Sequence, residues 1–212
     1  MIKEAGLEGS PWVALFIVVG GYLIGSLLPA EWIAQRKIGH SMQELNENPG
    51  GAGIYRKAGF WAAVFVILFD IGKGILPVAL ADKFNIRGGW LVAAACAPVV
   101  GHNWPVYSGF RNGGKGMAAS LGAALWLGWP SILPGLGVGA VLVLWKRWAP
   151  WIGVVGLPLG LVGMALAGIQ PARLWAVASL IIIMLLRLIP WLSDQWQTLR
   201  KTGKFMPPGK SW

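Results

Sequence analysis

The chain has little of what a disulfide-bonded or metal-binding protein needs. Its single cysteine, Cys96, excludes an intramolecular disulfide. Its only two histidines, His40 and His102, stand far apart in the sequence, and no second ligand follows either of them at metal-binding spacing. We therefore expect no metal site built from protein side chains and no cofactor.

Apolar residues, by contrast, are abundant. They make up 56% of the 212 residues, they occur in runs, and the mean hydropathy is +0.61. This composition indicates a multi-pass membrane protein whose partners include membrane lipids. The net charge of +10 could also suggest nucleic acid, but the basic residues are scattered over the loops between apolar runs. No nucleic-acid partner is expected, because such proteins gather their charge on one face.

Seven apolar runs predict an all-α bundle of seven transmembrane helices. We expect residues 1–212 to form one membrane domain, with a retained N-terminal segment (1–10) and a flexible tail (204–212). The third and fourth runs are short, which fits helices that end within a polar cavity. The predicted spans are 11–34, 59–81, 88–105, 116–128, 130–145, 151–169 and 172–192.

The distribution of charged residues predicts the orientation of the protein in the membrane, and the spacing of small residues predicts which helices pack closely. With the N-terminus outside, the inner loops carry twelve Lys and Arg residues and the outer segments four. This satisfies the positive-inside rule and places the C-terminus in the cytoplasm. Glycines four residues apart predict close helix contacts in the lipid. These pairs are Gly21 and Gly25, Gly135 and Gly139, and Gly156 and Gly160.

Two ionisable residues, Asp70 and Lys73, stand three positions apart in the middle of the second run. At this spacing they share one face of a helix. Charged groups at membrane depth are costly unless they pair or serve a function. Two interpretations stay open: a mutually satisfied structural pair, or a site in which Lys73 reaches an anionic ligand that Asp70 helps to position.

Residues 101–116 form a polar, basic, glycine-rich stretch between two apolar runs. Backbone N–H groups beside glycines, together with cationic side chains, are suited to holding a phosphate. Ser120 lies one turn into the helix that follows, whose N-terminal dipole would favour an anion. A flexible basic turn is the alternative. The candidate phosphate-binding residues of the loop are Arg111, Gly113, Gly114, Lys115 and Gly116.

Three further polar positions are candidates. His102, which precedes Asn103, could act as an acid, a base or a donor to phosphate, or could be structural. Ser26, near the end of the first run, could be a ligand hydroxyl or could bond to its own helix. The loop 35–58 is the longest polar segment, and turn residues dominate it.

Taken together, these segments resemble the bacterial acyl-phosphate:glycerol-3-phosphate acyltransferases of the PlsY type. The resemblance covers most of the chain, in order. The matching residues are Gly25 and Ser26, Asn48–Gly50 with Arg56, residues 70–74, residues 101–106, and Gly109, Phe110 and residues 113–116.

The resemblance implies a PlsY-like seven-span protein of the bacterial inner membrane, with its N-terminus outside. It implies acyl transfer from an acyl phosphate to the primary hydroxyl of glycerol 3-phosphate, without a metal or cofactor. We assign Ser26, Lys73 and His102 to catalysis. The substrate-binding candidates are Asn48, Arg56, Asp70, Asn103, Arg111, Gly113, Gly114, Lys115, Gly116 and Ser120.

The chain departs from the family pattern in two regions and within the glycine-rich loop. In the first loop, Met42 stands where an arginine is expected, and Ala52 and Gly53 replace a threonine and an asparagine. Asn112 is an insertion, and Ala119 replaces a threonine. Near the C-terminus a His-Arg-Glu-Asn pattern corresponds to residues 193–196, which are Ser, Asp, Gln and Trp. Each replacement, as distinct from the insertion, removes a charge or a specific hydrogen-bonding group from the expected site.

Three functions are compatible with these observations. The first is a catalytically impaired accessory subunit of a larger membrane protein complex that retains a pocket for a lipid phosphate. The second is an active acyl-phosphate:glycerol-3-phosphate acyltransferase that makes lysophosphatidic acid for phospholipid synthesis. The third is a transporter, since polar groups at membrane depth also occur along translocation paths, but no inverted repeat is visible.

Overall fold

The computed structural model describes residues 9–146 and 148–202, with the side chains of residues 190–199, 201 and 202 left undescribed. Every regular element in these ranges is helical. The predicted tail (204–212) and most of the N-terminal segment lie outside the described residues. The elements are α1 (Pro11–Gly25), α2 (Pro29–Ile38), α3 (Gly51–Ala58), α4 (Phe60–Lys83), α5 (Gly88–Asn103), the 3₁₀ turn η1 (Val106–Ser108), α6 (Met117–Gly128), α7 (Leu133–Lys146), the π-helical segment η2 (Ile152–Gly156), α8 (Leu157–Leu166) and α9 (Pro171–Thr202).

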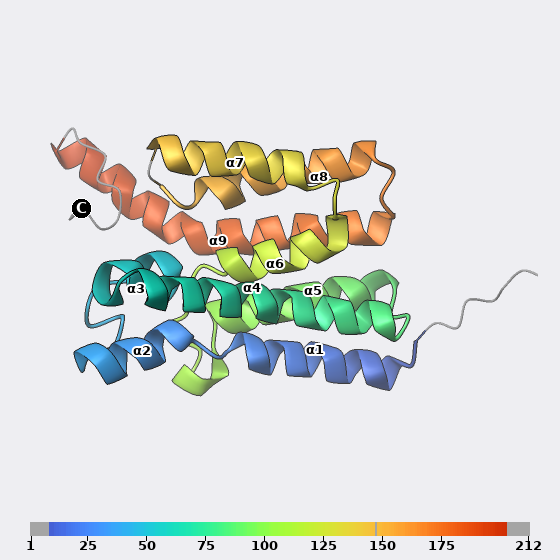
Figure 1. Cartoon of the computed structure of the whole chain (residues 1–212), viewed down its shortest axis with the longest axis horizontal. Coiled ribbons are helices and arrows are strands. Elements are labelled where there is room, and N and C mark those ends of the chain that lie inside the picture. Colours follow the sequence, from blue (N-terminus) through green and yellow to red (C-terminus); the bar gives the residue numbers. More distant parts are fainter. Residues whose placement is uncertain (1–8, 147, 203–212) are drawn as a thin grey trace, which may run out of the picture.

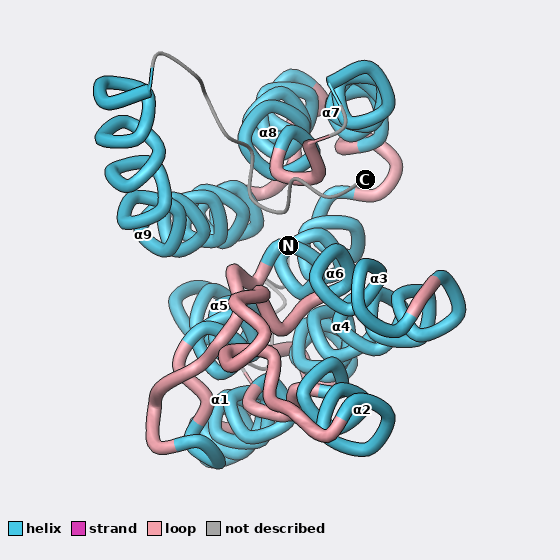
Figure 2. The backbone as a smooth tube through the Cα atoms, turned by 90° about the vertical axis from the view of Figure 1, so that its left-hand side faces the viewer, coloured by secondary structure: helices cyan, strands magenta, loops and turns pink. Residues whose placement is uncertain are grey.

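The long helices lie side by side and nearly parallel to one axis (Figure 1). Packing is most extensive between α4 and α6, between α1 and α5, and between α5 and α9. Helices α7 and α8 form a hairpin on the far side of α9 and α6 from α1, and the end-on view separates this hairpin from the α1–α5 group (Figures 1 and 2). Short helices α2 and α3 cover one end of α4.

Three helical stretches among the described residues are long and apolar enough to cross a membrane. They are residues 11–38, which comprise α1 and α2, the whole of α4, and residues 171–189 of α9. Helices α6 and α7 and the combined η2–α8 segment are shorter apolar helices. The all-helical character predicted from the sequence is confirmed. The predicted runs coincide with helices to within a few residues, except for the first and the last run in the chain.

The predicted first span, residues 11–34, contains an interruption that was not predicted, although the whole stretch 11–38 is long and apolar enough to cross a membrane. Helix α1 ends at Gly25 and α2 begins at Pro29, with Leu28 in an extended conformation between them. Proline disfavours the helical conformation in the residue before it and lacks the N–H group that a continuous helix would use. The loop expected at 35–58 is also partly helical, since α2 continues to Ile38 and α3 occupies residues 51–58.

The predicted glycine contacts are confirmed. A side chain on Gly135 would lie 2.1 Å from the backbone nitrogen of Gly160, and one on Gly139 would lie 2.9 Å from the Cα of Gly156. On the other side of the molecule, a side chain on Gly25 would lie 2.3 Å from the carbonyl oxygen of Pro98. The backbones of α7 and α8, and of α1 and α5, therefore touch without intervening side chains, as expected where lipid supplies no hydrophobic driving force.

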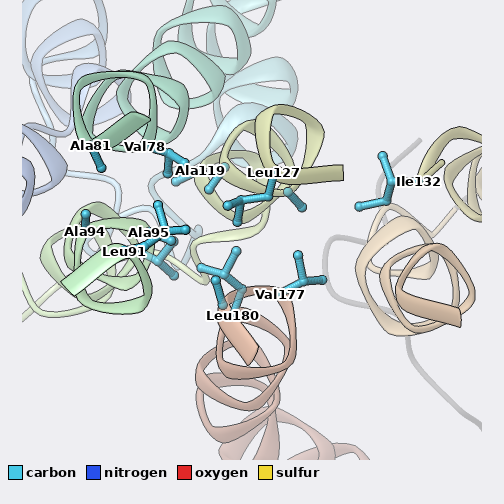
Figure 3. Close-up of a cluster of buried hydrophobic side chains, with 14 of the residues drawn as sticks. Val78, Ala81, Leu91, Ala94, Ala95, Ala119, Leu127, Ile132, Val177 and Leu180 are labelled. Atoms are coloured by element: carbon cyan, nitrogen blue, oxygen red, sulfur yellow. The ribbon is translucent and has the colours of Figure 1, made fainter. Parts of the chain in front are cut away.

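Small apolar side chains from four helices fill the centre of the molecule. Figure 3 shows those of α4, α5, α6 and α9 converging on one cluster. Alanines contribute heavily, which lets the helix axes approach closely. The buried members labelled there are Val78, Ala81, Leu91, Ala94, Ala95, Ala119, Leu127, Val177 and Leu180. Ile132, just before α7, is also buried and labelled but lies apart from them.

A carboxylate at the end of α4 ties the same helices together at one end of the bundle. Both oxygens of Asp82 accept hydrogen bonds of 2.8 Å from Arg173 at the start of α9, and one also accepts from Arg87, before α5, at 2.8 Å. The indole N–H of Trp126 in α6 donates to the other oxygen at 2.9 Å. One side chain thus joins four elements that are distant in sequence.

Replacing Asp82 with asparagine should lower the free energy of unfolding by about 1.5–3 kcal/mol, because several hydrogen bonds to a charged acceptor are weakened together. The expected result is a lower midpoint of thermal unfolding of the purified protein in detergent. Lys83→Gln, at the exposed neighbouring position, is the matched control and should leave the midpoint unchanged. Equal midpoints for Asp82→Asn and Lys83→Gln would contradict this role.

Candidate functional site

The centre of the candidate site is a buried cluster of charged and polar side chains where α1, α4 and α5 meet. Lys73 and Asp70 of α4 are 3% and 1% exposed, and His102 of α5 is 3% exposed. The Lys73 ammonium lies 2.8 Å from Asp70 Oδ1 and 2.8 Å from His102 Nδ1. Asp70 and Lys73 therefore pair on one helix face, as their spacing predicts, and His102 joins them.

The break between α1 and α2 supplies the remaining partners of this lysine. Lys73 Nζ donates to the carbonyl oxygens of Gly25 at 3.0 Å and Leu27 at 2.9 Å. These carbonyls follow the last turn of α1, where helical acceptors have no partner within the helix. A buried ammonium is tolerated when acceptors surround it. Lys73 thus contacts the protein on several sides, and its ammonium points to these groups, not into the cavity described below.

Ser26 lies at this break and uses its hydroxyl within the protein. Its Oγ donates to the carbonyl of Tyr22 at 2.9 Å and accepts from the Val106 N–H at 3.3 Å. The bond to Tyr22 is the local one within the helix that the sequence left open as an alternative. Ser26 also lines a polar cavity of about 400 Å³, together with Leu27, Leu28, Glu31, Trp32, Gln35, Ser41, Tyr107, Ser108 and Asn112.

The glycines after η1 are required by close packing on the end of α5. A side chain on Gly114 would lie 2.0 Å from His102 Nε2, and one on Gly113 would lie 2.1 Å from the carbonyl oxygen of Asn103. Gly116, the N-cap of α6, has φ +68°, a conformation that favours glycine. The Gly114 N–H donates to the His102 carbonyl at 3.0 Å, so it is occupied within the protein.

An arginine from α9 holds this glycine segment from the other side. Arg187 donates to the carbonyl of Gly114 through Nε and to that of Gly113 through Nη2, each at 3.1 Å. Its guanidinium also lies 5.6 Å from the centre of the Trp104 ring, within the range of a cation–π contact. Arg187 was not among the predicted site residues, although an arginine within an apolar span indicates a function.

A cavity of about 410 Å³ lies beside the cluster and has one polar end and one apolar end. Its polar end includes Asp70, His102, Lys115 and the first turn of α6 at Gly116. Its apolar end runs between α6 and the α7–η2 pair. The cavity is lined by Asn48, Gly50, Gly51, Ala52, Ile67, Asp70, His102, Lys115, Gly116, Met117, Ala118, Leu121, Ala140, Val143, Leu144, Ala149 and Ile152.

Lys115 is the basic side chain that lines this cavity. Burial, and then the positive charges of Arg56 and Arg187, lower the pKa of its ammonium from the ordinary value. An anion in the cavity would offset this cost by supplying the opposite charge. The free N–H groups of the first turn of α6, where no side chain caps the helix, lie at the same end. The polar end can therefore bind a phosphate or another oxyanion.

The first loop reaches the cavity through Asn48 and Ala52 and is held by an ion pair and by close packing. Glu47 and Arg56 form a two-pronged ion pair that is largely buried. This hydrogen bonding raises the pKa of the Arg56 guanidinium. Met42 is fully buried, and a side chain on Gly53 would lie 2.9 Å from its Cε. The two departures at Met42 and Gly53 thus belong to one packed contact.

The structure brings only some of the predicted site residues to this cavity. Asn48, Asp70, His102, Lys115 and Gly116 line it, whereas Ser26 lines the second cavity, and Lys73 lies between the two. Gly113 and Gly114 form the segment that packs on α5. Arg56 pairs with Glu47 near Lys115, and the side chain of Arg111 is exposed.

Asn103, which packs against Gly113 and Gly116, and Ser120, in the first turns of α6, are both fully buried. Neither side chain has a hydrogen-bond partner among the described residues. Within the same part of the chain, no group of three or more His, Cys, Asp or Glu side chains lies close enough to hold a metal ion.

Comparisons with known proteins agree with this geometry. The profile of the family described as glycerol-3-phosphate acyltransferase matches residues 15–197. The glycerol-3-phosphate acyltransferase of Methylococcus capsulatus is 33% identical over 186 residues, which cover 82% of this chain and 87% of that protein. That of a Synechococcus species is 34% identical over 151 residues, which cover 69% and 74% of the two chains.

Two solved structures have the same fold. Both are of PlsY (YgiH), an integral membrane glycerol 3-phosphate acyltransferase. Its glycerol 3-phosphate form aligns with a TM-score of 0.79 and 29% identity over 92% of this chain and 96% of that one. Its lysophosphatidic acid form aligns with a TM-score of 0.77 and 28% identity over 92% and 95% of the two chains.

Replacing Gly114 with alanine should destabilise the protein by about 1–3 kcal/mol, because the new methyl group would overlap His102 Nε2 and would have to displace the ring or the loop. The measurement is the midpoint of thermal unfolding in detergent. Gly72→Ala, in a part of α4 where an added Cβ meets no atom within 4 Å, is the control and should stabilise slightly. If both substitutions stabilise, the close packing of the glycine segment is not required.

Proposed function

Because the chain belongs to the glycerol-3-phosphate acyltransferase family, we propose that it transfers an acyl group from an acyl phosphate to glycerol 3-phosphate in a bacterial inner membrane. One observation carries this proposal: a single cavity joins a cationic end, at Lys115 and the start of α6, to an apolar end. Both substrates are anionic, and one also has a long hydrocarbon chain. The cavity offers a matching environment to each part.

The polar end is suited to the phosphate groups. Lys115 supplies a positive charge, and the N-terminus of α6 supplies N–H groups and a favourable dipole. Asn48, from the first loop, offers an amide that can bind a hydroxyl. The acyl chain would lie along the apolar wall formed by Leu121 of α6, Ala140 of α7 and Ile152 of η2.

The proposed reaction needs little from the protein beyond placement and charge. The primary hydroxyl oxygen of glycerol 3-phosphate forms a bond to the carbonyl carbon of the acyl phosphate, and the bond from that carbon to the phosphate oxygen breaks. The phosphate leaves with the bonding electrons, and the proton lost by the hydroxyl leaves on it. Lys115 and His102 would stabilise the negative charge that develops.

The accessory-subunit hypothesis rested on the polar groups missing from the first loop and the C-terminal segment. The comparisons favour the active enzyme over this hypothesis, because the relatives and the solved structures of the same fold are described as acyltransferases. The first loop is also stabilised by the largely buried ion pair between Glu47 and Arg56. The corresponding C-terminal side chains, at 193–196, lie outside the described ones.

We further propose that the described helices make seven spans in one membrane domain, with the N-terminus outside. The helix pattern matches the predicted runs, and the positive-inside count supports the orientation. In this arrangement Lys115 lies on the cytoplasmic side, and the Asp82 network lies on the outer side.

Purified protein should release phosphate and form lysophosphatidic acid when given an acyl phosphate and glycerol 3-phosphate. Lys115→Ala should lower this turnover by about 100-fold or more, because it removes a charge from a confined anion site. Lys57→Ala, at an exposed position of α3, is the matched control and should retain activity. A folded protein without turnover would support the accessory-subunit hypothesis instead.

Cysteine labelling tests the orientation. In a Cys96→Ala background, Lys83→Cys should react with a membrane-impermeant maleimide in spheroplasts, because the end of α4 would face outward. Lys37→Cys should react only after the membrane is opened. Both positions are exposed. The reverse labelling pattern would mean that the protein is inserted the other way round.

A further inference from the structure

We propose that Lys73 is a positioning residue that fixes His102 as the neutral tautomer with its proton on Nε2. His102 would then present an N–H donor to an oxyanion in the cavity and could not act as a base. The identity of that oxyanion as a phosphate or acyl-phosphate oxygen rests on the function proposed above. The tautomer itself does not depend on that function.

The contact between Lys73 and His102 determines which nitrogen of the imidazole ring accepts a hydrogen bond. Lys73 Nζ lies 2.8 Å from His102 Nδ1. An ammonium group donates hydrogen bonds and accepts none. The other neighbours of Nζ are oxygens, those of Gly25, Leu27 and Asp70, at 2.8–3.0 Å. Two of the three ammonium hydrogens reach the carbonyl oxygens of Gly25 and Leu27, while Asp70 Oδ1 meets Nζ as an ion pair and not as a hydrogen-bond acceptor. The third hydrogen is left for Nδ1, which is therefore an acceptor, and in a neutral ring the proton is on Nε2.

The alternative forms of the ring fit the surroundings poorly. A proton on Nδ1 would point at the Lys73 ammonium, and the carboxylate oxygen near that nitrogen, Asp70 Oδ1, is 3.5 Å away. This is longer than a normal N–H···O bond. A doubly protonated ring would add a second positive charge 2.8 Å from Lys73. Arg187, which binds the Gly113 and Gly114 carbonyls, already adds positive charge nearby.

The opposite nitrogen, Nε2, belongs to a ring that lines the cavity and is not occupied by Lys73. His102 lines the cavity together with Lys115 and Gly116. Nε2 lies against Gly114, whose missing side chain leaves room for the ring. No hydrogen bond from Nε2 is found among the backbone groups and side chains that the structure describes. Donors of two kinds, an imidazole N–H and an ammonium, therefore line the same polar end, and the group that complements both is an oxyanion.

This assignment limits what His102 can do in the proposed reaction. Nε2 carries a hydrogen and has no lone pair available, and Nδ1 is occupied by Lys73. The ring therefore cannot take the proton of the attacking hydroxyl, which must leave on the released phosphate. The contribution of His102 is a hydrogen bond to oxygen, and that of Lys73 is to keep the ring in the form that donates it.

Nitrogen-15 NMR of labelled histidine tests the tautomer directly. The chain has two histidines, so His40→Gln leaves His102 as the only signal; His40 is exposed and lies outside both cavities. In the full-length protein in lipid nanodiscs at neutral pH, we expect an unprotonated Nδ1 and a protonated Nε2. A protonated Nδ1, in either the other tautomer or the imidazolium, would overturn the proposal. This readout is independent of any enzymatic activity.

Two sets of variants test the consequences. In the His40→Gln background, Lys73→Met should give NMR signals from both neutral tautomers of His102. Unchanged signals would show that Lys73 does not determine the tautomer. For turnover, His102→Gln keeps an N–H donor near Nε2 but offers no base. It should retain activity within about 10-fold, whereas His102→Ala should lose about 100-fold or more. Equal losses in His102→Gln and His102→Ala would contradict the donor role.

Discussion

The buried ammonium of Lys73 is the constraint on which the rest of the site depends. An isolated charge at membrane depth is unfavourable, so the protein must surround it with acceptors. Those acceptors come from the broken end of α1, from Asp70 on the same helix and from His102 on α5. The break after Gly25, which would leave unpaired carbonyls in a continuous apolar environment, is stabilised by the same contact. One charge thus stabilises both an interrupted helix and the orientation of an imidazole.

The glycines of the segment 113–116 have a packing role in addition to the phosphate-binding role predicted for the segment. Its glycines suggested backbone N–H groups turned toward a phosphate. In the structure, Gly113 and Gly114 are needed because the end of α5 leaves no room for a side chain, and Arg187 and the His102 carbonyl use their peptide groups. The other two features that the sequence predicted for anion binding, Lys115 and the uncapped first turn of α6, lie at the polar end of the cavity.

The helices and much of the site could be predicted from the sequence, because apolar runs define helices in membranes and because ionisable residues such as Asp70 and Lys73 are rare within them. Close contacts at Gly25 and Gly139 followed from residue size alone. The division of the first run depended on a proline whose effect competes with strong hydrophobicity, and it was missed. The roles of Arg187 and Glu47 were also missed, since their partners come from distant parts of the chain and one-dimensional spacing carries no signal of that pairing.

The two-ended shape of the main cavity has a consequence for how reactants of opposite solubility could meet. Its apolar end passes between α6 and the α7–η2 pair, where Leu144 is 79% exposed on the outer surface that a bilayer would cover. A hydrocarbon tail could slide in sideways from the surrounding lipid leaflet, while a water-soluble headgroup arrives from the aqueous phase beside Lys115. Neither compound would need to leave the medium in which it dissolves, and an amphiphilic product could depart directly into the leaflet that receives it.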